Sequence, residues 1–198
     1  MFDAIVIGAG FAGLYAIYRL RGLGFKVLCV EAGSDLGGTW YWNRYPGARC
    51  DVESMSYSYS FDESLQQDWR WTRRYAEQPE ILDYANHVAS RFDLRRHIVF
   101  EQRVLSARYD DSDHFWRLVT QAGSMFRSRF VLLATGSLSV PKWPELEGLD
   151  SFGGECFHTG SWPHREITFS GKRVALIGTG ASGVQAAPVI AEQATSLA

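Results

Sequence analysis

Two segments with the spacing G-x-G-x-x-G constrain the fold of this chain more than any other feature. They run from Gly8 to Gly13 and from Gly178 to Gly183, and each directly follows a short apolar run with β-branched residues. The first glycine of this pattern permits a tight turn, the second lets backbone approach a pyrophosphate, and the third lets a helix pack on a strand. Their first glycines are 170 residues apart, so the pattern predicts two separate α/β nucleotide-binding units.

The first unit contains the strand, glycine turn, helix and acidic residue of a dinucleotide site in the required order. A strand is expected over 3–7, a helix over 14–20 and a second strand over 26–30, which ends at Glu31. An acidic residue there accepts hydrogen bonds from ribose hydroxyls and repels a 2′-phosphate, which favours FAD or NAD over NADP. A glycine turn with an incidental surface glutamate is the alternative. The nucleotide contacts predicted in this turn are Gly8, Gly10, Phe11, Ala12 and Gly13.

The second unit begins with a strand over 172–177 and one helix, which by themselves are too little to bury their apolar faces. One flavin and one nicotinamide cofactor form a hydride-transfer pair, which is the economical assignment for two such units. Side chains that discriminate NADPH from NADH usually lie about 20 residues past the glycines, and Gly178 plus 20 is the last residue, 198. The predicted contacts are Gly178, Thr179, Gly180, Ala181, Ser182, Gly183 and Gln185.

Composition narrows the class of protein further. Hydrophobic residues make up 46% of the 198 residues, the formal net charge is −2, and the arginines are scattered. The composition therefore argues against nucleic acid as a partner. Cys29, Cys50 and Cys156 form no disulfide or metal pattern, which favours a reducing, cytoplasmic setting. No targeting segment or apolar run long enough for a membrane span is recognised.

The middle of the chain predicts packing elements. An amphipathic helix is expected over 79–92, and four β-rich runs (97–100, 104–109, 115–120 and 127–133) predict a small meander attached to the first unit. The acidic turn 110–113 lacks the glycine and terminal glutamate of an EF-hand loop, so it predicts a solvated hairpin tip.

An unusually aromatic loop spans 37–51 and contains Trp40, Tyr41, Trp42 and Tyr45. Large flat side chains can wall an isoalloxazine ring and exclude water, although a loop packed on its own aromatic core has the same composition. From the residues alone, Asp51 is more typical of a turn or capping residue.

Two motifs of the chain resemble those of Baeyer–Villiger monooxygenases, a class of flavoprotein monooxygenases. Segment 37–51 contains G-G-x-W followed by Y-P-G-x-x-x-D, and segment 152–163 reads F-x-G-x-x-x-H-x-x-x-W-P between the two glycine patterns. The resemblance implies that NADPH reduces FAD, that a C4a-peroxyflavin forms with O₂, and that one oxygen atom is inserted beside a ketone carbonyl to give an ester or lactone.

The resemblance also assigns roles to single residues. Asp51 would lie near the reactive edge of the flavin and hold an active-site arginine outside this chain. His158 would be functionally important in the connection between the nucleotide domains, whereas an isolated loop histidine is usually structural. Further flavin contacts implied in the same way are Gly38, Thr39, Trp40, Tyr41, Trp42, Tyr57, Val104 (backbone to adenine) and Ala134 in the A-T-G run.

The expected organisation is α/β. A Rossmann-like FAD-binding domain with a small meander (1–140) precedes a linker (141–171) and the start of a second Rossmann-like, NADP-binding domain (172–198). The family is typically longer, so the chain is expected to be an incomplete fragment whose remaining C-terminal part is a partner. Two alternatives stay open: an N- or S-oxygenating flavin monooxygenase, and a non-catalytic nucleotide-binding fragment.

Overall fold

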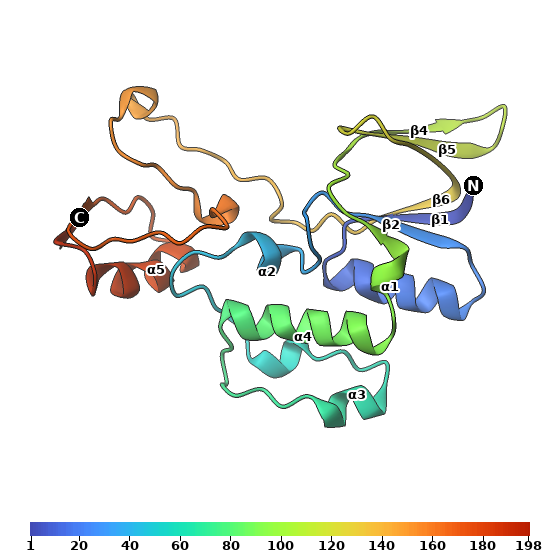
Figure 1. Cartoon of the computed structure of the whole chain (residues 1–198), viewed down its shortest axis with the longest axis horizontal. Coiled ribbons are helices and arrows are strands. Elements are labelled where there is room, and N and C mark those ends of the chain that lie inside the picture. Colours follow the sequence, from blue (N-terminus) through green and yellow to red (C-terminus); the bar gives the residue numbers. More distant parts are fainter. The chain divides into compact units, whose positions relative to one another are not determined.

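The computed structural model describes all 198 residues, which fall into two compact units (Figure 1). Unit 1 comprises residues 1–41 and 82–139, and unit 2 comprises 42–81 and 140–198. Residues 42–81 thus cluster with the C-terminal part of the chain, whereas the sequence-based boundaries at 140 and 171 stay a prediction. No helix is both long and apolar enough to cross a lipid bilayer.

Unit 1 is built on one six-stranded sheet with the order β3-β2-β1-β6-β5-β4 (Figure 1). Neighbours from β3 to β6 pair in parallel, and β6-β5-β4 form an antiparallel meander. The strands are β1 (Phe2–Ile7), β2 (Val27–Val30), β3 (Ile98–Val99), β4 (Val104–Asp110), β5 (Phe115–Thr120) and β6 (Met125–Leu133). This arrangement confirms the predicted α/β class and the meander.

The first of the four β-rich runs does not belong to the meander. Its two strand residues pair in parallel with β2, and the Glu31 N–H donates to the Val99 carbonyl at 2.9 Å. The short helix η2 (Arg95–His97) leads directly into this strand. The run therefore forms the outer parallel edge of the sheet, where it hydrogen-bonds to β2. Its sequence pattern predicted a strand but could not identify the strand with which it pairs.

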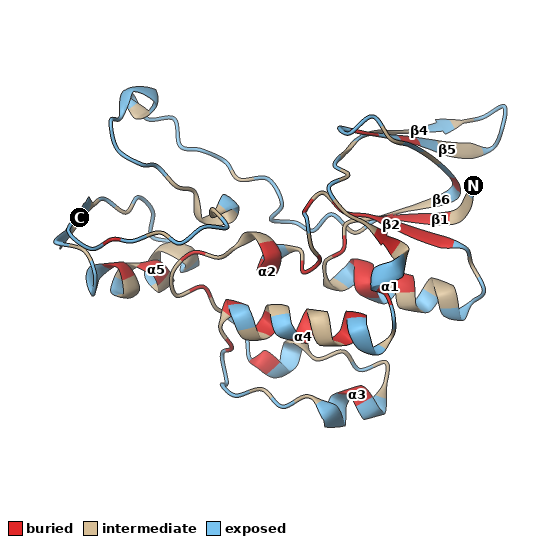
Figure 2. Ribbon diagram, viewed as in Figure 1, coloured by how far each residue is buried: buried red, intermediate tan, exposed pale blue.

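One part of the core of unit 1 lies between the parallel strands and helix α1 (Phe11–Gly22), and another joins these strands to the meander. All residues of β2 are buried, and α1 contributes Leu14 and Ile17, which are fully buried (Figure 2). A run buried on both faces is what a parallel strand requires. Burial also raises the pKa of the Cys29 thiol, so this cysteine is a packing residue and not a nucleophile.

Helix α4 (Gln78–Arg91) confirms the predicted amphipathic helix and begins one residue earlier. Ile81, Tyr84, Ala85 and Val88 are buried on its apolar face, which follows the predicted spacing. The Tyr84 ring stacks on Phe11 with centroids 6.1 Å apart. The helix thus contacts the start of α1.

Unit 2 contains the second glycine pattern. A short parallel pair, β7 (Arg173–Val174) and β8 (Ser196–Leu197), flanks α5 (Ala181–Ala191). The strand β8 was not predicted, because two residues carry no recognisable period. The other elements are α3 (Glu63–Asp68) and the 3₁₀ turns η1 (Ser54–Tyr57), η3 (Leu149–Ser151) and η4 (Thr159–Ser161).

The aromatic segment predicted as a loop contains a single helical turn, α2 (Thr39–Trp42), at the boundary between the units. Trp40 and Tyr41 are buried. The Tyr41 hydroxyl accepts a hydrogen bond from the Ser34 N–H at 3.1 Å. Part of the aromatic content thus packs within unit 1, as the aromatic-core alternative required.

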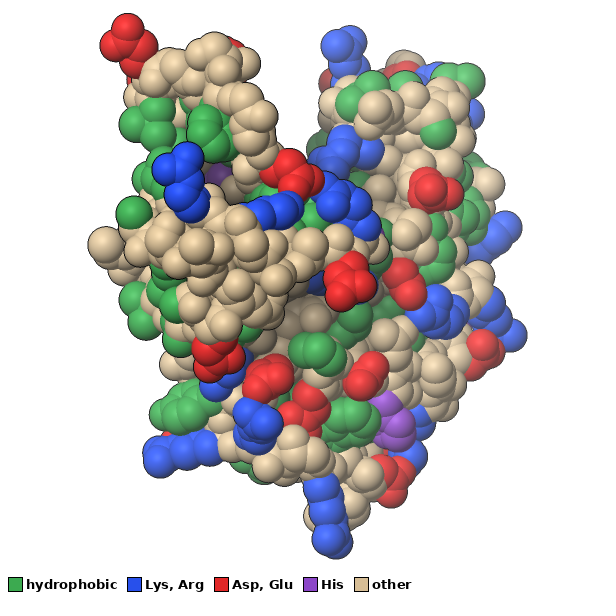
Figure 3. Space-filling model, turned by 60° about the vertical axis from the view of Figure 1, so that its left-hand side comes forward, with side chains coloured by type: hydrophobic (Ala, Val, Ile, Leu, Met, Phe, Trp, Pro, Cys, Tyr) green, Lys and Arg blue, Asp and Glu red, His purple; other side chains and the backbone are tan.

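Opposite charges are interspersed on the face of the molecule drawn in Figure 3. Arg95–Asp35, at 2.8 Å, is typical of the exposed ion pairs. Such pairs contribute at most about 1 kcal/mol each because water screens them. The buried apolar clusters therefore dominate the stability of the fold.

The acidic hairpin tip carries a carboxylate that should stay charged in strong acid. The Ser112 hydroxyl, the Asp113 N–H and Arg117 hold the pKa of Asp110 at about 2, below its ordinary 3.8. Because the folded pKa is lowered, this contribution to stability is present above pH 3.8 and is lost as the pH falls towards 2. A carboxyl ¹³C titration by NMR should show the low midpoint, and Ser112→Ala should raise it. A wild-type midpoint near the ordinary value would contradict the prediction.

Candidate functional site

The first glycine pattern forms a turn that leaves no room for side chains. Gly8 has a φ of +103°, and an added Cβ would lie 2.5 Å from the Ala134 carbonyl oxygen. An added Cβ at Gly13 would lie 1.9 Å from the Gly8 oxygen. Backbone therefore approaches backbone here, as a nucleotide-binding turn requires. The predicted residue Ala134 is brought to this turn by β6, and its N–H donates to the Ile7 carbonyl at 2.9 Å.

Helix α1 begins directly at this turn, and no side chain caps its first N–H groups. Gly10 is the N-cap residue. The Leu14 N–H makes a helical bond to the Gly10 carbonyl at 2.9 Å, so the preceding amides have no intrahelical acceptor. These amides and the helix dipole attract a phosphate. Gly38 lies against the turn, because its added Cβ would be 2.8 Å from the Gly10 Cα.

Glu31 is buried and already engaged by the backbone around the turn. Its Oε2 accepts from the Ala9 N–H at 2.6 Å and its Oε1 accepts from the Gly33 N–H at 2.7 Å. Charge-assisted bonds of this kind are strong. Each carboxylate oxygen retains a second lone pair, so the group can accept a ribose hydroxyl as well. Glu31 is thus no incidental surface residue.

The second glycine pattern repeats the local geometry of the first. Gly178 has a φ of +116°, and an added Cβ at Gly183 would lie 2.5 Å from the Gly178 oxygen. The Val184 N–H bonds to the Gly180 carbonyl at 3.1 Å, and Gly180 caps α5 without a side-chain bond. An added Cβ at Gly178 meets nothing within 4 Å, whereas one at Gly8 meets the backbone of Ala134 and Thr135, just after β6. The second turn therefore has the same local geometry, but no other segment packs against its first glycine.

Asp51 lies in an exposed bend that is held on its C-terminal side by a buried serine. The Ser54 hydroxyl donates to the Arg73 carbonyl at 2.7 Å and accepts from the Ala76 N–H at 2.8 Å. The Cys50 N–H donates to the Ala76 carbonyl at 3.0 Å. Ser54 was not predicted, because a single serine in a polar stretch carries no pattern. The Ser54 and Cys50 bonds together fix the backbone on either side of Asp51, whose side chain stays exposed.

His158 connects its own turn to the preceding extended segment of unit 2. Its Nδ1 accepts from the Gly160 N–H at 3.0 Å, and its Nε2 lies 3.3 Å from the Lys142 carbonyl oxygen. A ring that accepts at Nδ1 can donate to the Lys142 carbonyl from Nε2. The Trp143 ring lies edge-on at 5.4 Å. These contacts hold the 158–161 turn against the segment around Lys142, which is a structural role. No hydrogen bond or ion pair joins His158 to Asp51.

Loss of the His158 ring should release the segment around Lys142. His158→Ala removes the Lys142 contact and the Trp143 ring contact, together worth about 1 kcal/mol at this half-buried position. Trypsin cleavage after Lys142 should therefore accelerate about five-fold, as followed by mass spectrometry. His158→Asn retains a capping acceptor for Gly160 and separates the cap from the Lys142 contact. An unchanged rate of cleavage in His158→Ala would show that His158 does not hold this segment in place.

The Trp-Pro end of the second motif shares an open cavity of about 310 Å³ with the aromatic segment. Trp162 and Pro163 line it together with Arg44 and Pro46. His164 also lines the cavity, and burial together with the Arg44 guanidinium lowers its pKa. Two motifs that are far apart in sequence thus meet within unit 2.

The other predicted residues lie in both units. Thr39 and Val104 belong to unit 1, where Val104 opens β4 and packs on the buried cluster of the sheet. Trp42 and Tyr57 belong to unit 2, and Tyr57 ends η1. The roles of these side chains stay predictions.

Comparison with known proteins agrees with this geometry. The family model described as "Flavin-binding monooxygenase-like" matches residues 3–197, so the chain belongs to that family. A Baeyer–Villiger monooxygenase of Pseudooceanicola batsensis is 47% identical over 93% of this chain and 34% of its own length. Phenazine N-monooxygenase PhzNO1 of Lysobacter antibioticus is also 47% identical, with the same coverage.

A solved structure extends the likeness to three dimensions. The crystal structure of OTEMO in complex with FAD and NADP has a TM-score of 0.93 and 46% identity. The match covers 99% of this chain and 38% of that one. The chain therefore spans little more than a third of the length of the proteins that it matches.

Proposed function

We propose that this chain is the nucleotide-binding part of an FAD- and NADPH-dependent Baeyer–Villiger monooxygenase. That enzyme inserts one oxygen atom of O₂ beside a ketone carbonyl to give an ester or lactone. The observation that carries the proposal is the pair of glycine turns with equivalent geometry, at Gly8 and Gly178, on either side of the 152–163 motif. One turn suits a flavin dinucleotide and the other a nicotinamide dinucleotide, which together supply electron transfer to oxygen.

The first turn fits the FAD pyrophosphate because a Cβ would fill the cradle at Gly8 and Gly13. In this role the amides at the start of α1 bind the phosphates, and Glu31 accepts a ribose hydroxyl through its remaining lone pairs. The buried Trp40 belongs to the segment proposed to exclude water from the flavin ring, and Gly38 brings that segment to the turn. The flavin, when bound, supplies hydride acceptance and oxygen activation.

Asp51 is proposed to orient an arginine that lies outside residues 1–198. Its exposed carboxylate, held by Ser54 and Cys50 on a fixed backbone, supports this role. An oriented arginine would stabilise negative charge on the substrate oxygen, which is the main electrostatic task in such a reaction. The proposed partner of this chain is therefore a polypeptide region that corresponds to the part of its relatives that this chain does not cover. Three free cysteines support a reducing, cytoplasmic setting.

Oxygen transfer to nitrogen is the second candidate function. It is favoured by the phenazine N-monooxygenase relative, which is as similar in sequence as the Baeyer–Villiger relative. The second glycine turn and the cofactors would serve both reactions. The two candidates therefore differ in product and not in the nucleotide sites.

Product analysis separates these candidates. The longest polypeptide that the gene encodes would be supplied with NADPH, O₂ and a panel of cyclic ketones, sulfides and aromatic amines. We expect lactone formation coupled to NADPH oxidation, detected by gas chromatography. N-oxide without any lactone would replace the main proposal by the second. The 198-residue chain is the matched control, and turnover by it alone would contradict the need for the additional region.

A further inference from the structure

Gln185 of α5 makes an unusually complete set of hydrogen bonds to the segment that leads to Asp51. Its Oε1 accepts from the Arg49 N–H at 3.2 Å and from the Tyr45 hydroxyl at 2.8 Å. Its Nε2 donates to the Arg49 carbonyl at 3.1 Å. One side-chain amide thus pairs with both backbone groups of Arg49, as a neighbouring strand would.

The donor and acceptor pattern fixes the orientation of this amide. If the amide were flipped, its NH₂ group would face the Arg49 N–H, and two donors would oppose each other. In the observed orientation both acceptor sites and one of two donors are used. Gln185, which was predicted to contact the nicotinamide nucleotide, therefore has a single N–H left for any ligand.

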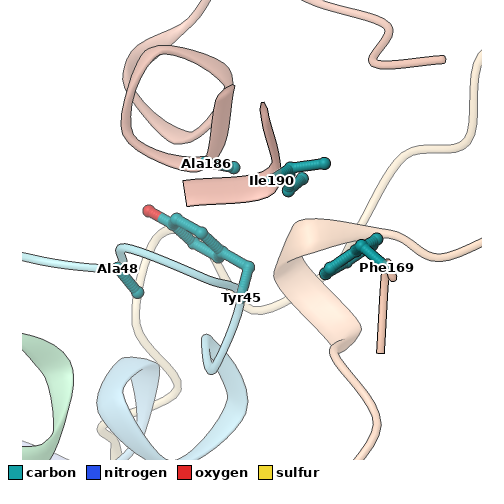
Figure 4. Close-up of a cluster of buried hydrophobic side chains, with 5 residues drawn as sticks. All are labelled: Tyr45, Ala48, Phe169, Ala186 and Ile190. Carbon is teal, nitrogen blue, oxygen red and sulfur yellow. The ribbon is translucent and has the colours of Figure 1, made fainter. Parts of the chain in front are cut away.

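Close packing holds the same segment against α5. Gly47 has a φ of +77°, and an added Cβ would lie 2.4 Å from the Gln185 carbonyl oxygen. The Tyr45 and Ala48 side chains form a buried cluster with Ala186 and Ile190 of α5 (Figure 4). Only glycine permits this approach of backbone to helix.

The other edge of the segment that leads to Asp51 is hydrogen-bonded to residues 76–78. The Gln78 N–H donates to the Ala48 carbonyl at 2.8 Å, and Arg49 forms an isolated antiparallel bridge with Glu77. Asp51 follows Arg49 by two residues. The backbone that precedes Asp51 is thus held between α5 and residues 76–78.

We propose that Gln185 is a positioning residue that pins the Asp51 segment to the helix of the second nucleotide turn. Any displacement of α5 is then transmitted through the Arg49 backbone to Asp51. The catalytic meaning of this link rests on the proposed function, whereas the link itself does not.

Hydrogen–deuterium exchange tests the link directly in the full-length, flavin-loaded protein. Gln185→Leu should raise exchange about ten-fold in the peptide 45–53, because the Arg49 amide loses its acceptor. Gln185→Glu keeps the shape and the acceptors but cannot donate to the Arg49 carbonyl, so a smaller increase is expected. Gln193→Leu, at an exposed position beyond the same helix, is the matched control and should change nothing.

Binding and coupling measurements distinguish positioning from nucleotide binding. We expect the Gln185 variants to retain NADP⁺ affinity within about two-fold and to yield less ester per NADPH consumed. A ten-fold loss of NADP⁺ affinity with unchanged exchange in 45–53 would overturn the proposal and make Gln185 a nucleotide ligand. If the wild-type protein formed no ester while the exchange increase occurred, the link would stand and the proposed function would fail.

Discussion

Gly13→Ala should destabilise unit 1 and abolish flavin retention. The added Cβ would lie 1.9 Å from the Gly8 carbonyl oxygen, and both atoms belong to rigid backbone. Relief requires α1 to move away from the turn, which costs about 3 kcal/mol in overpacking and lost helix–strand contact. For a protein of this size, that corresponds to a fall in Tm of roughly 6–12 °C. Differential scanning fluorimetry and the flavin-to-protein absorbance ratio measure the two effects.

Gly22→Ala is the control, because it adds the same methyl group at the end of the same helix. Nothing lies within 4 Å of its added Cβ, and its φ is not positive. This substitution should leave Tm unchanged or raise it slightly, through a gain of up to about 1 kcal/mol. Equal behaviour of the two variants would show that the close approach at Gly13 has no energetic consequence.

Glu31→Ala should have the second largest effect. It leaves the buried Ala9 and Gly33 N–H groups without their acceptor, and each costs about 1–3 kcal/mol. The proposed ribose contact is lost at the same time, which should weaken FAD binding at least about ten-fold. Chemical denaturation of the apoprotein and flavin titration separate the stability effect from the binding effect.

Glu31→Gln serves as the graded comparison, since one amide oxygen can replace one carboxylate oxygen. Its NH₂ group must then face one backbone N–H, so we expect roughly half of the stability loss. If Glu31→Ala left apoprotein stability unchanged, the carboxylate would serve the nucleotide alone.

Sequence patterns anticipated those elements whose spacing reflects a local rule. The glycine turns, α1, α4 and the meander follow from residue spacing and β-branched content, and the structure agrees with them. Two of the three two-residue strands, β3 and β8, were misplaced or missed. A two-residue strand has no period, so its place depends only on which neighbouring edge offers hydrogen bonds.

The candidate site shows the same division. The glycine spacing and the acidic Glu31 predicted two dinucleotide sites, because each has a steric or electrostatic reason. The class of chemistry was expected from the family resemblance of the other two motifs. The contacts that hold Asp51 were not readable in advance. Ser54 and Gln185 act on it through backbone groups, and such bonds impose no repeating pattern on sequence.

For this protein, local residue order was sufficient for the turns, the principal helices and the family to which it belongs. Tertiary structure alone decided that residues 42–81 cluster with residues 140–198, and that Gln185 bonds the Arg49 backbone instead of leaving its amide free. The physical reason is that a glycine turn is dictated by sterics within a few residues. The partner of a polar side chain depends on which distant backbone group the fold brings within hydrogen-bond distance.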